Sequence, residues 1–376
     1  MRLQKLLPIF YLLLPGCLLL TASCRKNNKP ESSTPVVKWE QVAGISNGPG
    51  LMNSAFQNNR LNVWGSSNYY PAVALSPTGT SSGFTTGIFQ GSGRLRFPVA
   101  DRYFAFTNNR QVVIRSALTT PANSVERIVD LGALDPDFST LADIPYWQGE
   151  AIGISANHFL LIPYRAVHNG VGIPTPYFAL IGLRPPQHSD SELQVSSVNL
   201  IRRNLFPGEV ALTAISSFGN FFFVNMGNAT YRIDTQGIMN KVADVTLNIY
   251  QKGSNLYGFS ANLNTDQADY YQSGDNGQSW QRVGGIAVGA LATLHYSVIG
   301  EQVIGYSNNQ LFLFETNGST FSVRELENEG LPPADITSVT LSGTDTVFLT
   351  MHANSFTSLS GAYYKPLAHL PDQKKK

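Results

Sequence analysis

Cysteine is almost absent from this chain of 376 residues, where it occurs only as Cys17 and Cys24. Beyond residue 24 the chain can therefore form no disulfide and no cysteine metal site, so that burial of a core must supply its stability. Charged residues are also scarce, at 14%, and no basic stripe provides the electrostatic footprint of a nucleic-acid-binding protein. We expect no nucleic acid partner.

Helical periodicity is missing as well. Between about residues 37 and 366, short runs of alternating apolar and polar residues recur, separated by Gly, Asn, Asp and Pro, and this pattern is typical of β-strands. The 21 Phe, 16 Tyr and 4 Trp also favour strands. With 43% hydrophobic residues, the chain is too apolar to be disordered. The sequence predicts an all-β fold.

Residues 1–23 have the pattern of an export signal, with Arg2 and Lys5 before the apolar run "LLPIFYLLLPGCLLL". The "TASC" that ends at Cys24 resembles the lipobox of a bacterial lipoprotein, which implies cleavage before Cys24 and acylation of its thiol. A plain signal peptide or a membrane-spanning anchor are the alternatives, although the run is shorter than the ~20 residues that a span requires. Residues 24–36 are then a lipidated flexible tether.

The resemblance to a lipoprotein implies a location at the outer membrane, anchored through Cys24. The segment "RKNNKPESS" after Cys24 does not open with the acidic residues that some Bacteroidota use as a surface-export signal, so the periplasmic side and the cell surface both stay open. Removal of residues 1–23 takes Arg2 and Lys5 from the 26 basic residues and leaves 24 basic against 25 acidic residues. The short basic tail, residues 371–376, ends in "KKK".

Seven units with two apolar strands around a small polar turn follow one another along the chain. They begin at Leu51, Gly93, Gly149, Ala211, Leu247, Ala292 and Ile336. Each is followed by enough residues for two more strands, and four strands per ~40–50 residues is the size of a propeller blade. We predict a single β-propeller over residues 37–370, with seven blades favoured and six or eight possible.

The chain ends carry two halves of one pattern. In residues 269–286, "DYYQ" leads into "SWQRVGGI", whereas "AYYK" at 362–365 has no such partner after it and "KWEQVAGI" at 38–45 has none before it. We expect residues 38–43 to pair with the last blade, so that an N-terminal strand closes the ring and removes an exposed edge.

Ser273, Asp275, Gly277 and Trp280 form a Ser-x-Asp-x-Gly-x-x-Trp motif. Its Asp-Asn-Gly is a hairpin signal with φ > 0 at Gly277, its Ser and Asp can hydrogen-bond the turn, and its Trp can pack beneath it. The motif resembles the Asp-box, or BNR repeat, of sialidases and other propellers. That resemblance implies a hairpin between the third and fourth strands of a blade, with a structural role.

No catalytic residues, metal ligands or cofactor site can be assigned. "GISNG" at 44–48 matches Gly-x-Ser-x-Gly, but no helix follows, and we interpret it as a loop. "RLRFP" at 94–98 faintly resembles a sialidase segment. Sialidases also need three arginines, and spacing does not assign Arg96, Arg165, Arg203 or Arg282 to such a triad. The six histidines form no metal-ligand spacing.

Two long, aromatic-rich connections, 134–150 and 164–177, are expected on one face of the propeller, and long loops tend to be functional. We predict a ligand site of Tyr146, Trp147, Arg165 and His168; the alternative is a loop that plugs the ring. The leading hypothesis is a non-catalytic binding or assembly protein for a glycan, a peptide or an envelope partner. A sialidase-like exo-glycosidase is the alternative.

Overall fold

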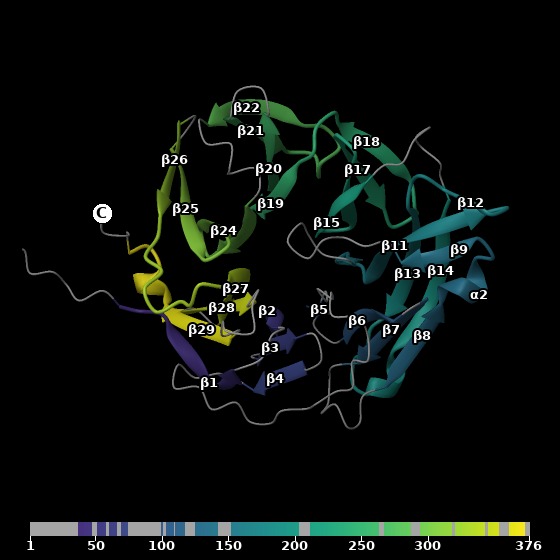
Figure 1. Ribbon diagram of the computed structural model, residues 1–376, viewed down its shortest axis with the longest axis horizontal. Helices are drawn as coiled ribbons and strands as arrows, with labels where there is room; N and C mark the ends of the chain where they lie inside the picture. Colours follow the sequence, from purple (N-terminus) through teal and green to yellow (C-terminus); the bar gives the residue numbers. More distant parts are fainter. Residues whose placement is uncertain are drawn as a thin grey trace, which may run out of the picture. The chain divides into compact units, whose positions relative to one another are not determined.

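Antiparallel β-strands make up nearly all the regular structure in the computed structural model of the protein. The model describes residues 37–46, 51–57, 60–65, 69–73, 99–100, 103–108, 110–116, 125–141, 152–202, 211–262, 267–286, 294–317, 320–342, 345–352 and 361–372. The residues from Lys38 to Lys376 belong to one compact unit. Within the described part of the chain, the strands, most of which are labelled in Figure 1, form seven sheets.

The sheets follow the chain, and in most of them the strands succeed one another from one edge to the other; β1, β9 and β12 are the exceptions. One contains β2 (Leu51–Gln57), β3 (Arg60–Gly65) and β4 (Tyr69–Val73). The next contains β5 (Val99–Ala100), β6 (Tyr103–Asn108), β7 (Gln111–Ser116) and β8 (Glu126–Asp130). The third contains β10 (Gly153–Ile154), β11 (Phe159–His168), β13 (Tyr177–Arg184) and β14 (Gln194–Ile201), with β9 (Phe138–Leu141) and β12 (Val171–Gly172) paired to β11.

Four further sheets complete the series. They contain β15 (Leu212–Phe218), β16 (Phe221–Met226), β17 (Ala229–Asp234) and β18 (Met239–Ala243); β19 (Asn248–Lys252), β20 (Asn255–Asn262), β21 (Gln267–Ser273) and β22 (Gln281–Ile286); and β23 (His295–Ile299), β24 (Gln302–Ser307), β25 (Gln310–Asn317) and β26 (Thr320–Glu325). The last contains β27 (Asp335–Ser342), β28 (Thr346–His352), β29 (Gly361–Pro366) and β1 (Glu40–Ser46). Helical structure in the described residues is limited to α2 (Leu131–Leu134) and the 3-10 turns η2 (Asp190–Glu192) and η4 (Leu367–His369).

Both faces of a central strand are buried, as β11 illustrates. Leu160 and Ile162 pack with the sheet of β5 to β8, while Leu161, which points to the opposite face, packs with the sheet of β15 to β18. A strand with side chains alternating between two covered faces reads as an almost continuous apolar run, here "FLLIPY". The cores of this protein therefore lie between neighbouring sheets.

The described sheets form an uninterrupted series of packed neighbours. Apolar clusters join the sheet of β5 to β8 to that of β10 to β14, and then to the sheets that begin with β15, β19, β23 and β27 in turn. β2 packs against β27 and β28, which adds the sheet of β2 to β4 to the other end of the series.

The last sheet joins the two ends of the described chain. β1 pairs antiparallel with β29, with Glu40 opposite Tyr364 and Gln41 opposite Tyr363. Just before β1, the Trp39 side chain is buried at 3% exposure, and its indole Nε1 donates to the Glu327 carbonyl at 3.3 Å. Ser46, which we expected in a loop, is the last residue of β1.

Candidate functional site

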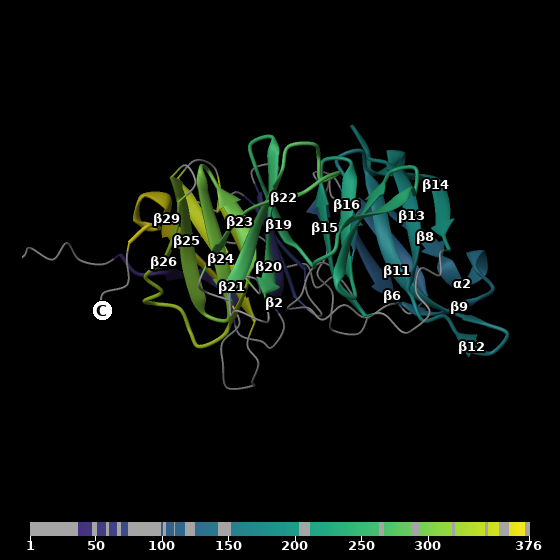
Figure 2. The same cartoon turned by 90° about the horizontal axis from the view of Figure 1, so that it is seen from above.

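Two short strands, β9 and β12, are added to the four main strands of the third sheet. The first part of β11 pairs with β13, and its last residues pair with β9 through Tyr164 to Ala166 and with β12 through Val167 and His168. We call residues 138–141, 164–168 and 171–172 the platform. β9 and β12 lie beside the end of β11 in both Figure 1 and Figure 2.

A one-turn helix leads the chain from β8 into the platform. Asp130 is the N-cap of α2, and its Oδ1 accepts a hydrogen bond from the Ala133 N–H at 3.1 Å. The other carboxylate oxygen of Asp130 accepts from Arg110 Nη2 at 2.8 Å. At the far end of the helix, the Asp135 N–H donates to the Leu131 carbonyl at 2.9 Å. The helix ends at a defined place, so that Asp135 is directed at β11.

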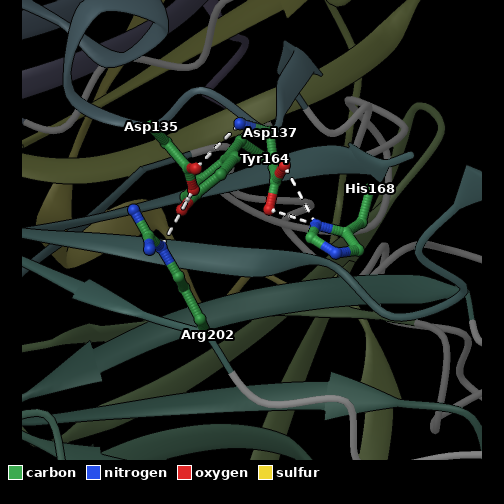
Figure 3. Close-up of polar contacts among 5 residues, drawn as sticks. All are labelled: Asp135, Asp137, Tyr164, His168 and Arg202. Carbon is green, nitrogen blue, oxygen red and sulfur yellow. Dashed lines mark hydrogen bonds and ion pairs between the residues drawn. The ribbon is translucent and has the colours of Figure 1, made fainter. Parts of the chain in front are cut away.

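Asp135 carries a fully buried carboxylate that three groups hold (Figure 3). The Tyr164 hydroxyl donates to its Oδ2 at 2.6 Å, and Nε of Arg202 lies 3.2 Å from the same oxygen. Its Oδ1 accepts from the Asp137 N–H at 3.0 Å. A buried carboxylate is stable only when it is paired and hydrogen-bonded, and this one meets both conditions.

The pKa of Tyr164 is raised well above its ordinary value. Burial is the largest cause, and the adjacent Asp135 carboxylate is the next. The Tyr164 hydroxyl therefore stays protonated and remains a donor to Asp135. Because the Tyr164 ring is completely buried, a substrate has no access to this pair. The Asp135 network fastens the connection from β8 to the edge of β11, and it supports the platform.

The outer side of the platform carries a second, exposed polar pair. His168 Nδ1 lies 3.0 Å from Asp137 Oδ2, and the two side chains are 61% and 30% exposed (Figure 3). The backbone of the same segment is tied to β11, since the Val167 N–H donates to the Asp137 carbonyl at 2.7 Å. The imidazole and the carboxylate are thus presented to solvent from a fixed backbone.

Exposed apolar side chains gather in the same region. Of the seven large hydrophobic residues that are most exposed in the described part of the chain, four come from β8, α2 and the β11–β12 hairpin: Ile128, Leu134, Val167 and Val171. Val171 is the most exposed of them, at 68%. Scattered surface valines are ordinary. On the β11–β12 hairpin, Val167 stands opposite Gly172 and Val171 opposite His168, so each face of this projecting strand pair exposes one apolar side chain, which suggests an interaction surface.

The predicted site residues fall into two groups. Arg165 and His168 both lie on β11, but alternation along a strand puts them on opposite faces. Arg165 is half-buried, and its Nη1 donates to the Pro174 carbonyl at 3.2 Å, so it braces the connection that leads into β13. Tyr146 and Trp147 lie outside the described residues, as does Cys24.

Sequence reasoning missed Asp135, Asp137, Tyr164 and Arg202. Asp135 is 29 residues from Tyr164, and Arg202 follows β14 two strands away, so no local spacing links them. One signal was available. Asp130 can cap a short helical turn, and the Asp-Pro-Asp sequence at 135–137 that ends this turn is typical of an ordered connection.

Of the arginines considered for a sialidase triad, the structure describes Arg165 and Arg282. They belong to different sheets, and Arg282 donates through Nε and Nη2 to the Asp269 carboxylate at 3.0 and 2.8 Å. Arg96 and Arg203 lie outside the described residues. Within the described ranges, no three His, Cys, Asp or Glu side chains are grouped so that they could hold a metal ion.

The turn between β21 and β22 is closed by its own side chains. The Ser273 hydroxyl donates to Asp275 Oδ1 at 2.7 Å and accepts from the Gly277 N–H at 2.9 Å. The Asp275 carboxylate accepts from the Ser279 N–H at 3.0 Å and from the Ser279 hydroxyl at 2.6 Å. β21 and β22 are the third and fourth strands of their sheet.

The same turn also contacts the neighbouring sheet. Arg232 on β17 donates through Nε to the Asn276 carbonyl at 3.1 Å. The Trp280 ring meets the Phe223 ring of β16 edge-on, with 6.2 Å between the centroids. Gly277, with φ +74°, leaves no room for a Cβ because the Phe223 ring lies directly against it. The turn therefore joins two sheets, in addition to closing a hairpin.

Solved structures with this fold are found among proteins of very different sequence. The chain is similar to a catalytically inactive virginiamycin B lyase from Staphylococcus aureus, crystallised with quinupristin, with a TM-score of 0.55, 11% identity, and coverage of 88% of this chain and 98% of the lyase. It is also similar to the Pan2 WD40 domain from Neurospora crassa, with a TM-score of 0.50, 10% identity, and coverage of 87% and 91%. WD40 domains are β-propellers, so this chain has a propeller-type fold.

A third similarity is to the extracellular domain of a hybrid two component system from B. thetaiotaomicron, with a TM-score of 0.49 and 10% identity. That match covers 86% of this chain, but this chain spans only 39% of that structure. No protein-family model matches the chain, and no curated protein matches its sequence. Among the described residues, no helix is long and apolar enough to cross a membrane. These similarities establish the fold alone, and function has to be argued from the residues.

Proposed function

We propose that the protein is a seven-bladed β-propeller of the bacterial cell envelope that binds a partner protein through its platform. The seven described sheets, packed in series, support the blade count. Ring closure in this proposal has two parts: β1 completes the last blade, and the sheet of β2 to β4 meets the sheet of β5 to β8. A cryo-electron or crystal structure tests both parts; six or eight blades would contradict the proposal.

The envelope location rests on the lipobox-like "TASC" that ends at Cys24. We propose that the acylated Cys24 holds the propeller at the outer membrane through residues 24–36. Cys24→Ala should release the protein from the membrane fraction and abolish labelling by a clickable fatty acid. Lipid labelling that persists in this variant would assign the anchor to another residue.

One observation carries the binding function. The strand pair at the end of β11 projects Val167 and Val171 into solvent, while a buried carboxylate, a tyrosine and an arginine fix its base. Interaction sites are most effective when rigid elements hold them, because less side-chain and loop entropy is lost on binding. The platform combines an exposed apolar tip with such a base.

The chemistry of the described surface favours a protein or peptide over a glycan. Its exposed large hydrophobic residues are Leu134, Val167 and Val171, and aliphatic side chains offer no aromatic ring on which a sugar could stack. His168 stands opposite Val171 and on the same face of the hairpin, so the exposed Asp137–His168 pair supplies polar contacts beside an apolar side chain, and protein interfaces combine these two kinds of contact. Tyr146 and Trp147, expected near the same connection, are the candidates that would add aromatic contacts.

Photo-crosslinking in intact cells tests the site. A photoreactive amino acid at position 171 should give a discrete protein adduct that is weakened by Val167→Ser and by Trp147→Ala. The matched control is position 283 on β22, where Val283 is also an exposed apolar residue, at 42%. Equal adducts at both positions, or none at position 171, would contradict the proposal.

Two assays address the other ligand classes. Glycan-array binding that Val171→Ser abolishes would make the partner a carbohydrate. Turnover of a fluorogenic sialoside by the purified protein would replace the binding function with the sialidase-like activity. We expect neither signal.

A further inference from the structure

The two edges of the described sheets differ in their surroundings. At one edge, strands of neighbouring sheets contact each other, as β19 does with β23 and β23 with β27. At the other edge stand β4, β8, β14, β18, β22, β26 and β1, which we call the outer strands. An edge strand leaves alternate N–H and C=O groups without a partner in its own sheet, so that a strand from another chain can pair with it.

β14 differs from the other outer strands in composition. It reads "QVSSVNLI" and holds neither a charged residue nor a proline. Charges and prolines protect edge strands from pairing with other chains. The other outer strands each hold at least one such residue: Pro71 in β4, Glu126 in β8, Lys241 in β18, Arg282 in β22, Arg324 in β26 and Glu40 in β1. The protection that β14 keeps is a bulge at Ser196, which leaves residues 197–201 regular.

The backbone of β14 is available for pairing on its outer side. On the inner side, β14 pairs with β13 in continuous register from Phe178 opposite Ile201 to Gly182 opposite Ser197. Among the described residues, no strand other than β13 pairs with β14, and no backbone hydrogen bond outside that ladder reaches residues 194–201. Residues 197–201 therefore present regularly spaced donors and acceptors away from their sheet.

The side chains of the same five residues complement themselves. When two copies of a strand pair antiparallel about a twofold axis, each residue faces the one at an equal distance beyond the centre. With Asn199 at the centre, Asn199 faces its own counterpart, and Val198 faces the Leu200 of the second copy. Two amides can exchange hydrogen bonds, and the other pair is apolar. Val198 and Leu200 already pack, half-buried, on the core between the second and third sheets, and a second copy would extend it.

We propose that β14 is a dimerisation edge, and that its partner is the β14 of a second copy of this chain. The two third sheets then form one continuous antiparallel sheet across the twofold axis. A second copy fits better than an unrelated strand, because the central amide pair and the two reciprocal apolar pairs arise when the strand meets itself. Asn199 Nδ2 donates to the Gln236 carbonyl at 3.3 Å, which leaves the amide oxygen as an acceptor. The platform does not include β14, so this inference is independent of the proposed binding function.

The first test is analytical ultracentrifugation of residues 24–376 with Cys24→Ser, which carry no lipid. The protein should show a monomer–dimer equilibrium. Asn199→Lys and Asn199→Glu each place two like charges against each other at the centre, and each should weaken the dimer on the order of fivefold. An equimolar mixture of the two variants should restore association, because opposite charges then meet. A protein that stays monomeric, or losses that the mixture does not rescue, would overturn the inference.

The matched control is Asn240→Lys, because Asn240 is also an exposed, neutral residue of an outer strand, β18. It should leave the dimer unchanged, and a loss equal to that of Asn199→Lys would count against β14.

A second test does not depend on charge. Residues directly opposite in an antiparallel pair lie about 5 Å apart, within the range of a disulfide. In the same cysteine-free chain, Asn199→Cys should give a disulfide-linked dimer under mild oxidation, and Asn240→Cys should not. In intact cells, an Asn199→Cys adduct with a different protein would mean that another protein's strand occupies this edge, and it would overturn the inference.

Discussion

Two aspartates organise two connections in this protein, and they do so by different means. Asp275 is exposed and closes its turn with Ser273 and Ser279, which lie two and four residues away. Asp135 is buried and is held by Tyr164 on β11 and by Arg202 just after β14, both far along the chain. The first is a local device that a short motif encodes, and the second exists only once a sheet has formed around it.

The largest effect should come from removing the buried carboxylate. Asp135→Ala leaves the buried Tyr164 hydroxyl and the Asp137 N–H without their acceptor, and breaking a buried, hydrogen-bonded pair costs about 3–5 kcal/mol. Because Arg202 is 44% exposed and can return to water, we expect the lower end, about 3 kcal/mol. Urea denaturation measures it.

Asp137→Ala is the control for that substitution, since among the described residues its carboxylate pairs with the exposed His168 side chain alone. Exposed pairs contribute about 0–1 kcal/mol. A loss for Asp135→Ala no larger than that for Asp137→Ala would show that the buried network does not support the platform.

This contrast also explains how much the sequence could predict. The alternating strand units, the turn between β21 and β22 and the two terminal strands that pair as β1 and β29 were all readable, because each depends on periodicity or on neighbours within a few residues. The Asp135 network was not, because its members meet through strand register. Arg165 and His168 show the same limit: both were expected in a long connection, yet they lie within strand β11 and on opposite faces of it.

The second effect concerns the contact between the β21–β22 turn and the sheet that contains β16. Gly277→Ala puts a methyl group against Phe223 at a residue with positive φ, and we expect a loss of about 2 kcal/mol. Gly253→Ala is the matched control, because Gly253 also has positive φ, at +60°, but nothing lies within 4 Å of its added Cβ. Thermal denaturation of both variants separates backbone strain from the clash. Equal losses of stability would mean that the Phe223 ring moves aside.

A third substitution concerns the buried amine of Lys365, whose one ion-pair partner in the described residues, Asp372 Oδ2, lies 4.0 Å away. Burial lowers the pKa of Lys365, and within the described residues its Nζ has no hydrogen-bond partner. In the unfolded chain this amine has the ordinary pKa of about 10.4, which is higher than in the folded protein. The charged amine therefore lowers the free energy of unfolding at neutral pH, and this loss becomes smaller as pH rises above the lowered pKa. We therefore expect Lys365→Met to raise the free energy of unfolding by about 1 kcal/mol at neutral pH. If guanidinium unfolding shows a loss of stability instead, the Lys365 amine has hydrogen-bond partners in solution.

A smaller effect should appear in acid. Partial burial raises the pKa of Asp275, but hydrogen bonds from Ser279 and Ser273 outweigh it and bring the value to about 2. An unfolded Asp has a pKa of about 3.9, so the stability from this carboxylate is complete above about pH 4 and is lost as pH falls toward 2. Asp275→Asn should flatten the dependence of Tm on pH in that window. An unchanged slope would show that the turn does not hold the ionised form.

The smallest effect belongs to the tip of the platform. Val171→Ser changes an exposed residue with no described role in the core, and surface substitutions of this kind stay within about 0.5 kcal/mol. Differential scanning calorimetry should therefore find the Tm unchanged, while crosslinking at the platform falls. A clear drop in Tm would assign Val171 to packing and leave the platform without its proposed interaction surface.

The pairing of β1 with β29 also sets the order in which the molecule can be completed. Glu40 and Tyr364, which face each other in that pair, are 324 residues apart. The strand made first must wait for the strand made last, and contacts so distant in sequence slow folding. During synthesis, Trp39 thus remains without its hydrogen-bond partners until Glu327 and Glu329 have been made. A chain that stops before residue 361 lacks β29, so an incomplete product cannot assemble the last sheet and is left open to proteolysis.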